Sequence, residues 1–262
     1  MRTSFVVWPA WCGAVLLSVC GATWAASSTA TLNDCNDTTP QVLQAQTLAA
    51  SANQARAAWL NAHTLRWAGA AQTGVYRLHA SSSGRLSVSD ELKVQGADSS
   101  WPLEPVEPVA PAPETEDSRR FSHITAGLTA RLSDEHARQL PTLLQQQVLL
   151  TREDPSGHVL DATQVQLAGA LDALYARAAQ VQDLGSQLQQ RSTTFKVWAP
   201  TAQKVHLCLF GSDDHGTGSA VDLVALHRDE TTGVWTAKLP QALNGVHYAF
   251  LVDVHVRGVG RV

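Results

Sequence analysis

The sequence offers few groupings of residues that could do chemistry. Segment 211–218, GSDDHGTG, brings Asp213, Asp214 and His215 together, and oxygen and imidazole groups of this kind bind metal ions. The same glycine- and aspartate-rich composition is typical of an exposed hairpin loop, which is the interpretation we adopt. The ten histidines form no His-x-x-x-His pair, and Cys-x-x-Cys, Gly-x-Ser-x-Gly and phosphate-binding glycine loops are absent from the sequence. We therefore predict no metal site, no cofactor and no catalytic residue in this chain.

The N-terminal residues predict export. Arg2 precedes an apolar run over residues 5–19, which is too short to cross a bilayer as a helix and has the length of a secretory signal. Cleavage after Ala25 would remove it. A second interpretation stays open, because residues 17–21, LSVCG, are similar to a bacterial lipobox in which Cys20 would be acylated. We expect an extracellular or periplasmic protein, or an outer-membrane lipoprotein that meets the membrane only through a lipid on Cys20.

The cysteine content allows one disulfide, and the charge content limits the classes of molecule that the chain is expected to bind. Without the leader only Cys35 and Cys208 remain. They could form one disulfide in an oxidising compartment, and two free thiols are the alternative, because spacing alone does not show pairing. The net charge of −4 and the scattered Lys and Arg residues give no basic field for phosphates, so nucleic acid is not an expected partner.

The elements that would position any site form two modules. A polar linker over 26–40 leads into the first, over 41–190, in which short alternating segments bounded by Gly and Ser predict antiparallel strands. These segments are 59–67, 75–80, 85–88 and 146–151. The proline-rich segment 101–113 predicts a loop or spacer, because proline removes ladder donors.

Two parts of the first module have helical signals. Residues 133–144 combine an N-cap serine with helix formers, interrupted by Pro141. The spacing Thr163-x-x-Gln166 is that of a capping box and predicts a helix from there to Val181, ended by Gly185. The apolar stripe of this helix predicts a packing face.

The second module, over 191–262, has clear strand patterns. Four segments alternate with a period of two, which predicts an immunoglobulin-like β-sandwich; they are 195–197, 205–209, 234–239 and 248–254. The whole chain is therefore expected to be mostly β with some α. We predict two β-sandwich modules of immunoglobulin or fibronectin type, the first with added helices, and no catalytic (β/α)₈ barrel.

Motifs in both modules carry a resemblance to a known family. The pattern Phe-x-Val-Trp-Ala-Pro-x-Ala-x-x-Val-x-Leu, over 195–207, resembles the opening of the family 48 carbohydrate-binding module that precedes the barrel in many glycoside hydrolases of the α-amylase clan. Segments 233–235, 239–240 and 245–252 fit the same module. Upstream, 59–76 and 146–175 are similar to the N-terminal domain of bacterial pullulanase-type α-1,6-glucosidases of glycoside hydrolase family 13.

The resemblance implies the non-catalytic N-terminal modules of an exported starch-debranching enzyme, which hydrolyses α-1,6-glucosidic links in pullulan, amylopectin or limit dextrins. Retaining enzymes of this kind need two carboxylates on rigid elements, and the clan takes them from barrel strands, one of them in an Arg-x-Asp segment. The single such segment here, Arg152-Glu153-Asp154, lacks the preceding glycine and runs into Pro155, so we expect a strand end followed by a turn. The resemblance also allows a structural calcium ion in the full-length enzyme.

The expected partners are the catalytic barrel in cis and α-glucan polysaccharide. In the family the barrel follows a segment like Gly258-Val259-Gly260. The candidates for stacking against sugar rings are Trp198, Trp235, Trp59 and Trp67. Packing is the competing interpretation for each of them, against the barrel for Trp198 and within a core for the others. The alternative function is a stand-alone α-glucan-binding or interaction protein of the cell surface.

Overall fold

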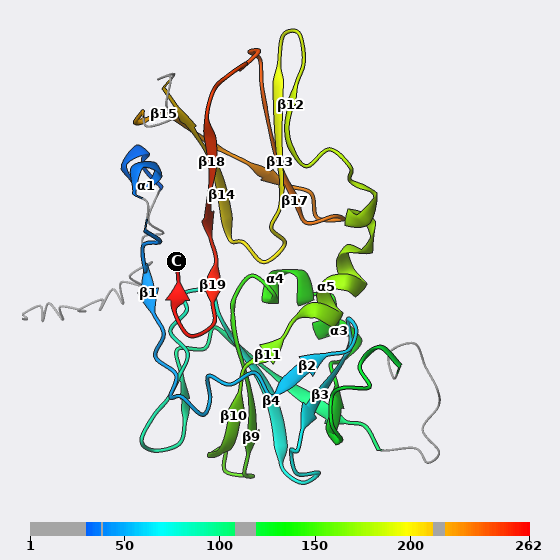
Figure 1. Ribbon diagram of the computed structural model, residues 1–262. Coiled ribbons are helices and arrows are strands. Elements are labelled where there is room, and N and C mark those ends of the chain that lie inside the picture. Colours follow the sequence, from blue (N-terminus) through cyan, green and yellow to red (C-terminus); the bar gives the residue numbers. More distant parts are fainter. Residues whose placement is uncertain (1–29, 38, 108–118, 212–217) are drawn as a thin grey trace, which may run out of the picture.

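The computed structural model describes residues 30–37, 39–107, 119–211 and 218–262. These residues form two β-rich modules with short helices between them, and an N-terminal segment runs along both modules (Figure 1). The described part of the chain is mostly β and contains no (β/α)₈ barrel. None of its helices has the length and apolar character needed to cross a membrane. The expected leader and Cys20 lie outside the described residues.

The first module is built on one eight-stranded sheet. Across the sheet its strands are β10 (Val159–Thr163), β9 (Gln147–Glu153), β4 (Val75–Ser81), β7 (Ser99–Pro105), β8 (Gly127–Arg131), β3 (Thr64–Ala68), β2 (Ala57–Trp59) and β11 (Val165–Gln166). Strand β7 joins the two halves, because residues 99–103 pair with β4 while residues 104–105 pair with β8. The sheet is therefore continuous, where two separate sheets of a sandwich were expected.

Strand β7 also corrects the expectation of a loop over 101–113. Residues 101–105 are extended and belong to the sheet. Proline is tolerated in a strand whose edge is unpaired, and over residues 99–103 the described ladder of β7 is to β4 alone, with Pro102 opposite Arg77. Residues 108–113 of the proline-rich segment lie outside the described residues.

Two apolar clusters lie on opposite faces of this sheet. Because alternate residues of a strand point to opposite sides, β9 gives Val148 and Leu150 to one cluster and Leu149 to the other. The larger cluster contains Trp59, Leu65, Trp67, Tyr76 and Leu78, all at most 1% exposed. The smaller cluster lies under the hairpin of β5 (Ser87–Val88) and β6 (Val94–Gln95). Both faces of the central strands are thus covered.

The helices of the first module are short. They include α3 (Asp134–Ala137), α4 (Leu140–Leu143), α5 (Ala168–Tyr175) and the 3₁₀ helix η1 (Ala176–Gln180). Ser133 caps α3 by accepting a hydrogen bond from the His136 amide at 3.3 Å. Pro141 lies in the first turn of α4, where its missing N–H is not needed.

The predicted capping box at Thr163 is wrong. Thr163 lies in β10, where its hydroxyl accepts a hydrogen bond from the Arg56 amide and donates one to the Gln54 carbonyl oxygen. The helix begins later, at Ala168, and Gly185 starts a strand. The sequence pattern predicts a helix in this region but places its start too early in the chain. Long-range hydrogen bonds hold Thr163 in the sheet.

The second module consists of two sheets that share one core. One sheet has the order β12 (Gly185–Leu188), β13 (Thr193–Trp198), β17 (Val234–Leu239) and β16 (His227–Arg228), and the other β15 (Ala220–Ala225), β14 (Lys204–Phe210) and β18 (Tyr248–Asp253). Inward side chains of both sheets, such as Phe195, Leu207 and Trp235, form the core between them. Strand β12 belongs to this module although the sequence placed the boundary at residue 190.

The N-terminal segment, defined here as residues 30–37 and 39–48, contacts both modules, whereas the sequence predicted a linker up to residue 40. Its helix α1 (Leu32–Asn36) contacts β15 and β18 of the second module. Further along, β1 (Gln44–Ala45) pairs with β20 (Gly260–Arg261), which also pairs with β19 (His255–Val256) (Figure 1). The Thr47 hydroxyl then donates a hydrogen bond of 2.7 Å to the Leu86 carbonyl oxygen in the first module.

Candidate functional site

Three of the four candidate tryptophans are core residues. Trp59 and Trp67 are 0% exposed, and Trp67 packs edge-on against Tyr76, with ring centroids 6.1 Å apart. Trp235 is 8% exposed and donates its indole N–H to the Ala199 carbonyl oxygen at 2.8 Å. A side chain without solvent exposure has no face to offer a polysaccharide. The burial of these three residues agrees with the packing interpretation, and they offer almost no ring surface to a sugar.

Trp198 is different, because 41% of it is exposed. Its strand, β13, turns Phe195 and Val197 toward the core, so Lys196 and Trp198 lie on the outer face of the sheet. The indole N–H donates a 2.9 Å hydrogen bond to the Thr232 carbonyl oxygen. The ring is therefore held in one orientation while part of its surface stays open to solvent.

The loop that holds Trp198 is itself rigid. The Asp229 carboxylate accepts hydrogen bonds from the amides of Thr231 and Thr232, at 2.8 and 2.9 Å. The hydrogen bonds from Thr232 and then Thr231 hold the pKa of Asp229 below its ordinary value. Gly233 has a φ of +69°, and a Cβ there would lie 2.7 Å from Cβ of Pro200. This position accepts only glycine without a shift of the loop.

The exposed Trp198 side chain shares one side of the sheet with Lys196, two residues earlier, and we call Trp198 with the neighbouring polar residues Lys196 and Glu230 the Trp198 face. Lys196 lies on the same side of the sheet and donates a 2.7 Å hydrogen bond to Asp183, which lowers the pKa of that carboxyl. Glu230 lies in the loop that holds Trp198, between Asp229 and Thr231, and accepts a hydrogen bond from Arg228 Nε at 3.2 Å. An aromatic surface bordered by ammonium and carboxylate groups can contact both the apolar and the hydroxyl faces of a sugar.

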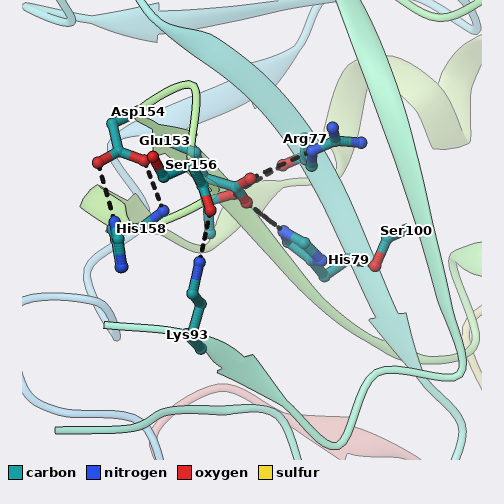
Figure 2. A network of polar contacts seen from close by, with 9 residues as sticks. Arg77, His79, Lys93, Ser100, Glu153, Asp154, Ser156 and His158 are labelled. Carbon is teal, nitrogen blue, oxygen red and sulfur yellow. Dashed lines mark hydrogen bonds and ion pairs between the residues drawn. The ribbon is translucent and has the colours of Figure 1, made fainter. Parts of the chain in front are cut away.

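The segment Arg152-Glu153-Asp154 ends β9 and enters a turn, as expected. Figure 2 shows what the sequence did not predict, a buried network around Glu153. The Glu153 carboxylate is acceptor for Arg77 Nε at 3.1 Å and for the Thr151 hydroxyl at 2.7 Å, and it lies 3.0 Å from His79 Nε2. Glu153 and His79 are 5% and 4% exposed.

This network is structural in character. His79 contacts Glu153 through one ring nitrogen and the Ser100 hydroxyl, at 2.7 Å, through the other. Burial lowers the pKa of His79 more than the Glu153 contact raises it, so the ring is neutral at neutral pH. Both oxygens of Glu153 are occupied by partners on the neighbouring strand β4, so this carboxylate is not free to attack or to protonate a sugar.

One signal in the sequence could have indicated the network. Arg77 and His79 occupy alternate positions of a strand whose other alternate residues, Tyr76 and Leu78, are apolar. This places the two basic side chains on one face of the sheet. Their carboxylate partner is 74 residues away in the sequence from His79, and no local pattern shows that pairing.

Comparison with known proteins assigns both modules. Residues 54–173 match the family model of the pullulanase N2 domain, and residues 183–261 match that of carbohydrate-binding module 48, described as the isoamylase N-terminal domain. The chain carries a pullulanase N2 domain followed by a family 48 carbohydrate-binding module. These regions match the N-terminal part of Klebsiella pullulanase.

Individual relatives agree with this assignment. The chain is 31% identical over 201 residues to a pullulanase of Klebsiella pneumoniae, an overlap of 77% of this chain and 17% of that protein. It is 26% identical over 200 residues to pullulanase 1, chloroplastic, of Arabidopsis thaliana, which covers 76% and 19% of the two. The chain therefore spans less than a fifth of the length of these relatives.

Solved structures resemble the fold of both modules together. The Klebsiella pneumoniae pullulanase complexed with maltotriose aligns with a TM-score of 0.67 at 29% identity, over 80% of this chain and 19% of that one. The apo pullulanase of the same organism gives a TM-score of 0.67 at 29% identity, over 80% and 22%.

The remaining candidate residues divide between the described and the other parts of the chain. Cys35 of the N-terminal segment and Cys208 of the family 48 module form a disulfide, with their Cα atoms 5.8 Å apart. Asp213, Asp214 and His215 lie outside the described residues, as does Cys20. Among the described residues no group of three or more metal-binding side chains comes together.

Proposed function

We propose that this chain is the non-catalytic N-terminal region of an exported debranching enzyme that hydrolyses α-1,6-glucosidic links in pullulan, amylopectin or limit dextrins. The observation that carries the proposal is the order of its modules, a pullulanase N2 domain followed directly by a family 48 module. Within that enzyme the two modules support the catalytic barrel and contact α-glucan. The hydrolytic step belongs to the barrel.

The contact with glucan is assigned to the Trp198 face. A sugar ring stacks its C–H groups on an aromatic surface, and the surrounding polar side chains bind its hydroxyl groups. Among the four tryptophans proposed from the sequence, only Trp198 has an exposed surface. Its hydrogen bond to Thr232 fixes the ring before binding, which reduces the entropy lost when the sugar docks.

The supporting role follows from the way the modules are joined. The N-terminal segment is bonded to the second module through Cys208 and to the first through Leu86. Direct hydrogen bonds also cross the junction, from Gln145 Nε2 to the Ala202 carbonyl oxygen at 2.6 Å and from Gln203 Nε2 to the Ser82 carbonyl oxygen at 2.9 Å. Because a disulfide through the N-terminal segment and several hydrogen bonds join the two modules, they can support a catalytic barrel as one unit.

Export is supported by the disulfide. Disulfides persist in oxidising compartments and are rare in the reducing cytosol, so the Cys35–Cys208 pair fits a periplasmic or extracellular protein. In this proposal residues 1–25 direct export, with a lipid on Cys20 as the variant that would hold the protein at the outer membrane.

Calorimetric titration of the full chain with maltotriose and with pullulan tests the function. We expect binding of maltotriose and no release of reducing sugar from pullulan. Trp198→Ala should weaken binding at this face by about tenfold or more, in line with the cost of removing an aromatic anchor. Val221→Ala is the matched control, because Val221 lies in the same module and is 63% exposed.

Three outcomes would contradict the proposal in different ways. Hydrolysis of pullulan by this chain would overturn its non-catalytic role. Equal effects of Trp198→Ala and Val221→Ala would remove the Trp198 face as the contact. Tight glucan binding by a chain whose coding sequence stops after Val262 would instead favour the stand-alone α-glucan-binding protein of the cell surface.

A further inference from the structure

The buried Glu153–His79 network ends at an exposed hydroxyl group, that of Ser100 on β7. Figure 2 shows the three side chains in a row, with His79 between the carboxylate and the hydroxyl. Ser100 Oγ lies 2.7 Å from His79 Nδ1, and His79 Nε2 lies 3.0 Å from Glu153 Oε1. His79 and Glu153 are buried, whereas Ser100 is exposed. A hydroxyl, an imidazole and a carboxylate linked in this order are the groups that activate a serine as a nucleophile, on any fold.

The partners of Glu153 determine which nitrogen of His79 carries the proton. The carboxylate forms an ion pair with Arg77 and accepts a hydrogen bond from the Thr151 hydroxyl. An ionised carboxylate accepts hydrogen bonds and donates none, so the Nε2 atom that faces it carries the N–H. The ring is neutral because burial lowers the pKa of His79, and Nδ1 is then the acceptor. Ser100 therefore donates its hydroxyl proton to the nitrogen that can take it.

The backbone N–H of Ser100 points away from β4. Residues 99–103 of β7 pair with β4 alone in the described part of the chain. The Ala80 carbonyl oxygen accepts a hydrogen bond from the Asp98 N–H, so Ala80 and its alternate neighbours on β4 direct their backbone polar groups at β7. His79 lies between these residues, and its pair with Ser100 is therefore of the non-hydrogen-bonded kind. The Ser100 N–H thus lies at the open edge of β7, where it can donate to an oxyanion formed at its own side chain, as in serine hydrolases.

We propose that Ser100 is a nucleophile that takes acyl groups from small activated esters, with His79 as its general base. Glu153 is a positioning residue, because it contacts His79 and not the ester. This activity is separate from the hydrolysis of glucan and does not depend on the proposed function.

The reaction has two steps. In the first, Ser100 Oγ bonds to the carbonyl carbon of the ester while its proton moves to His79 Nδ1, and the electron pair of the C=O bond moves to the oxygen. The C=O bond re-forms as the bond to the leaving oxygen breaks, and that oxygen takes the proton from Nδ1. In the second step, water attacks the acyl group in the same way, which releases the acid and restores the Ser100 hydroxyl.

The surroundings of Ser100 select the ester and the slower step. Ser100 and Pro102 are both exposed on this face of β7, so the surface gives little binding energy to a long acyl chain. The reactivity of the leaving group then decides which esters react. His79 is 4% exposed, so water reaches Nδ1 only beside Ser100, and we expect release of the acyl group to be slower than its uptake.

Release of p-nitrophenolate from p-nitrophenyl acetate tests the proposal on the full chain. We expect a burst of about one equivalent of product per chain, with the acetyl group found on Ser100 by peptide mass mapping. Ser100→Ala should abolish the burst and fold normally, because this residue is exposed. Ser99→Ala is the matched control, since the neighbouring side chain points to the other face of the sheet and the burst should remain. The lack of a burst in the wild type, or an equal burst in Ser100→Ala, would overturn the proposal.

The pH profile of the burst rate tests His79 as the base. The charged groups that act on His79 are Glu153 on β9 and Arg77 on β4. A protonated ring cannot accept the Ser100 proton, so the rate should fall as the pH decreases through the pKa of His79, which burial places below the ordinary value of about 6.5. His79→Gln should slow the burst by about 100-fold, with folding checked by circular dichroism. A wild-type rate that does not change between pH 7.5 and 5 would overturn His79 as the base, whether or not the variant folds.

Glu153→Gln tests the positioning residue, because it keeps the size of the side chain and removes its charge. Burial lowers the pKa of His79 and the Glu153 contact raises it, so the profile of the variant should move to lower pH. The burst should also slow by about 10-fold or more, because Nε2 loses the carboxylate that fixes its proton. A purely structural role would leave the profile of the folded variant where it is in the wild type, and that result would overturn the assignment of Glu153.

Discussion

The two modules cover their sheets in different ways. In the first, apolar clusters lie on both faces of the central strands, and the buried Glu153–His79 network lies on the same face as the smaller cluster. In the second, the two sheets share a single core between them, and the outer faces carry the exposed Trp198 on one sheet and the disulfide to Cys35 on the other. Both faces of the central strands are thus covered in the first module. The second module has an exposed aromatic residue on one outer sheet face and is linked by a disulfide to the N-terminal segment.

The two modules therefore differ in whether their polar side chains stabilise the fold or are available for binding. A buried carboxylate must have its hydrogen bonds satisfied, or its desolvation destabilises the fold. The outer face of the second module has no such requirement, so its side chains are free to meet a ligand or another domain. We therefore expect substitutions to affect stability in the first module and binding in the second.

The largest effect is expected from Glu153→Ala. It removes the carboxylate shared by His79, Thr151 and Arg77, and each buried polar group left unsatisfied costs about 1–3 kcal/mol. Urea unfolding followed by circular dichroism measures the loss. Asp154→Ala is the matched control, because the neighbouring carboxylate is a third exposed and pairs with His158 at 3.0 Å. An ion pair at the surface contributes little to stability, so equal losses in the two variants would contradict a structural role for the buried network.

The disulfide should have the next largest effect. It closes a sequence separation of 173 residues, and native disulfides typically contribute about 2–4 kcal/mol. Reduction should therefore lower the urea midpoint of the wild type and leave the Cys35→Ser/Cys208→Ser double variant unchanged.

Hydrogen exchange shows where the disulfide acts. The amides of Leu43 and Gln46 donate to the Arg261 and Val259 carbonyl oxygens, at 2.8 and 2.9 Å. After reduction these amides should exchange faster, while those of β4 and β9 keep their protection. Unchanged protection at Leu43 and Gln46 would mean that the β1–β20 pairing alone holds the N-terminal segment.

The strands of the second module could largely be predicted from the sequence. Each of its central strands alternates apolar and polar residues, with Phe195 and Val197 on the core face of β13 and Trp198 on the other. Strand β15, over Ala220–Ala225, was missed because it lies at the edge of its sheet and none of its residues is fully buried. Edge strands lose the period-two signal when neither face is packed.

Most long-range features could not be predicted, and the Cys35–Cys208 disulfide was predicted only as one of two alternatives. The pairing of Cys35 with Cys208, the Glu153–His79 contact and the β1–β20 ladder each join residues far apart in the sequence. The sequence around one residue of such a contact does not identify the residue that it contacts. The cavity between the two modules is also a long-range feature, since residues of both modules line it.

The smallest effect concerns pH and compares one histidine in each module. Burial is the main cause that lowers the pKa of His79, which contacts Glu153, Thr151 and Ser100 and lies near Arg77. Burial is also the main cause that lowers the pKa of His206, which lies near Lys204 and Asp253. A folded-state pKa below the ordinary value of about 6.5 means that the unfolded chain binds more protons just below that pH. Stability is then full above about pH 6.5 and falls as the pH decreases through the folded-state pKa.

Variants assign this loss to a module. The slope of unfolding free energy between pH 7.5 and 5 should become shallower in His79→Gln and, by a smaller amount, in His206→Gln, since His206 is partly exposed. The carboxyls with lowered pKa, such as Asp154 and Asp229, titrate at lower pH and do not contribute in this range. An unchanged slope in His79→Gln would show that the buried ring accepts a proton as easily as it does in the unfolded chain. In that case Glu153 stabilises the charged ring as much as burial destabilises it, and the first module holds an ion pair in place of a neutral hydrogen bond.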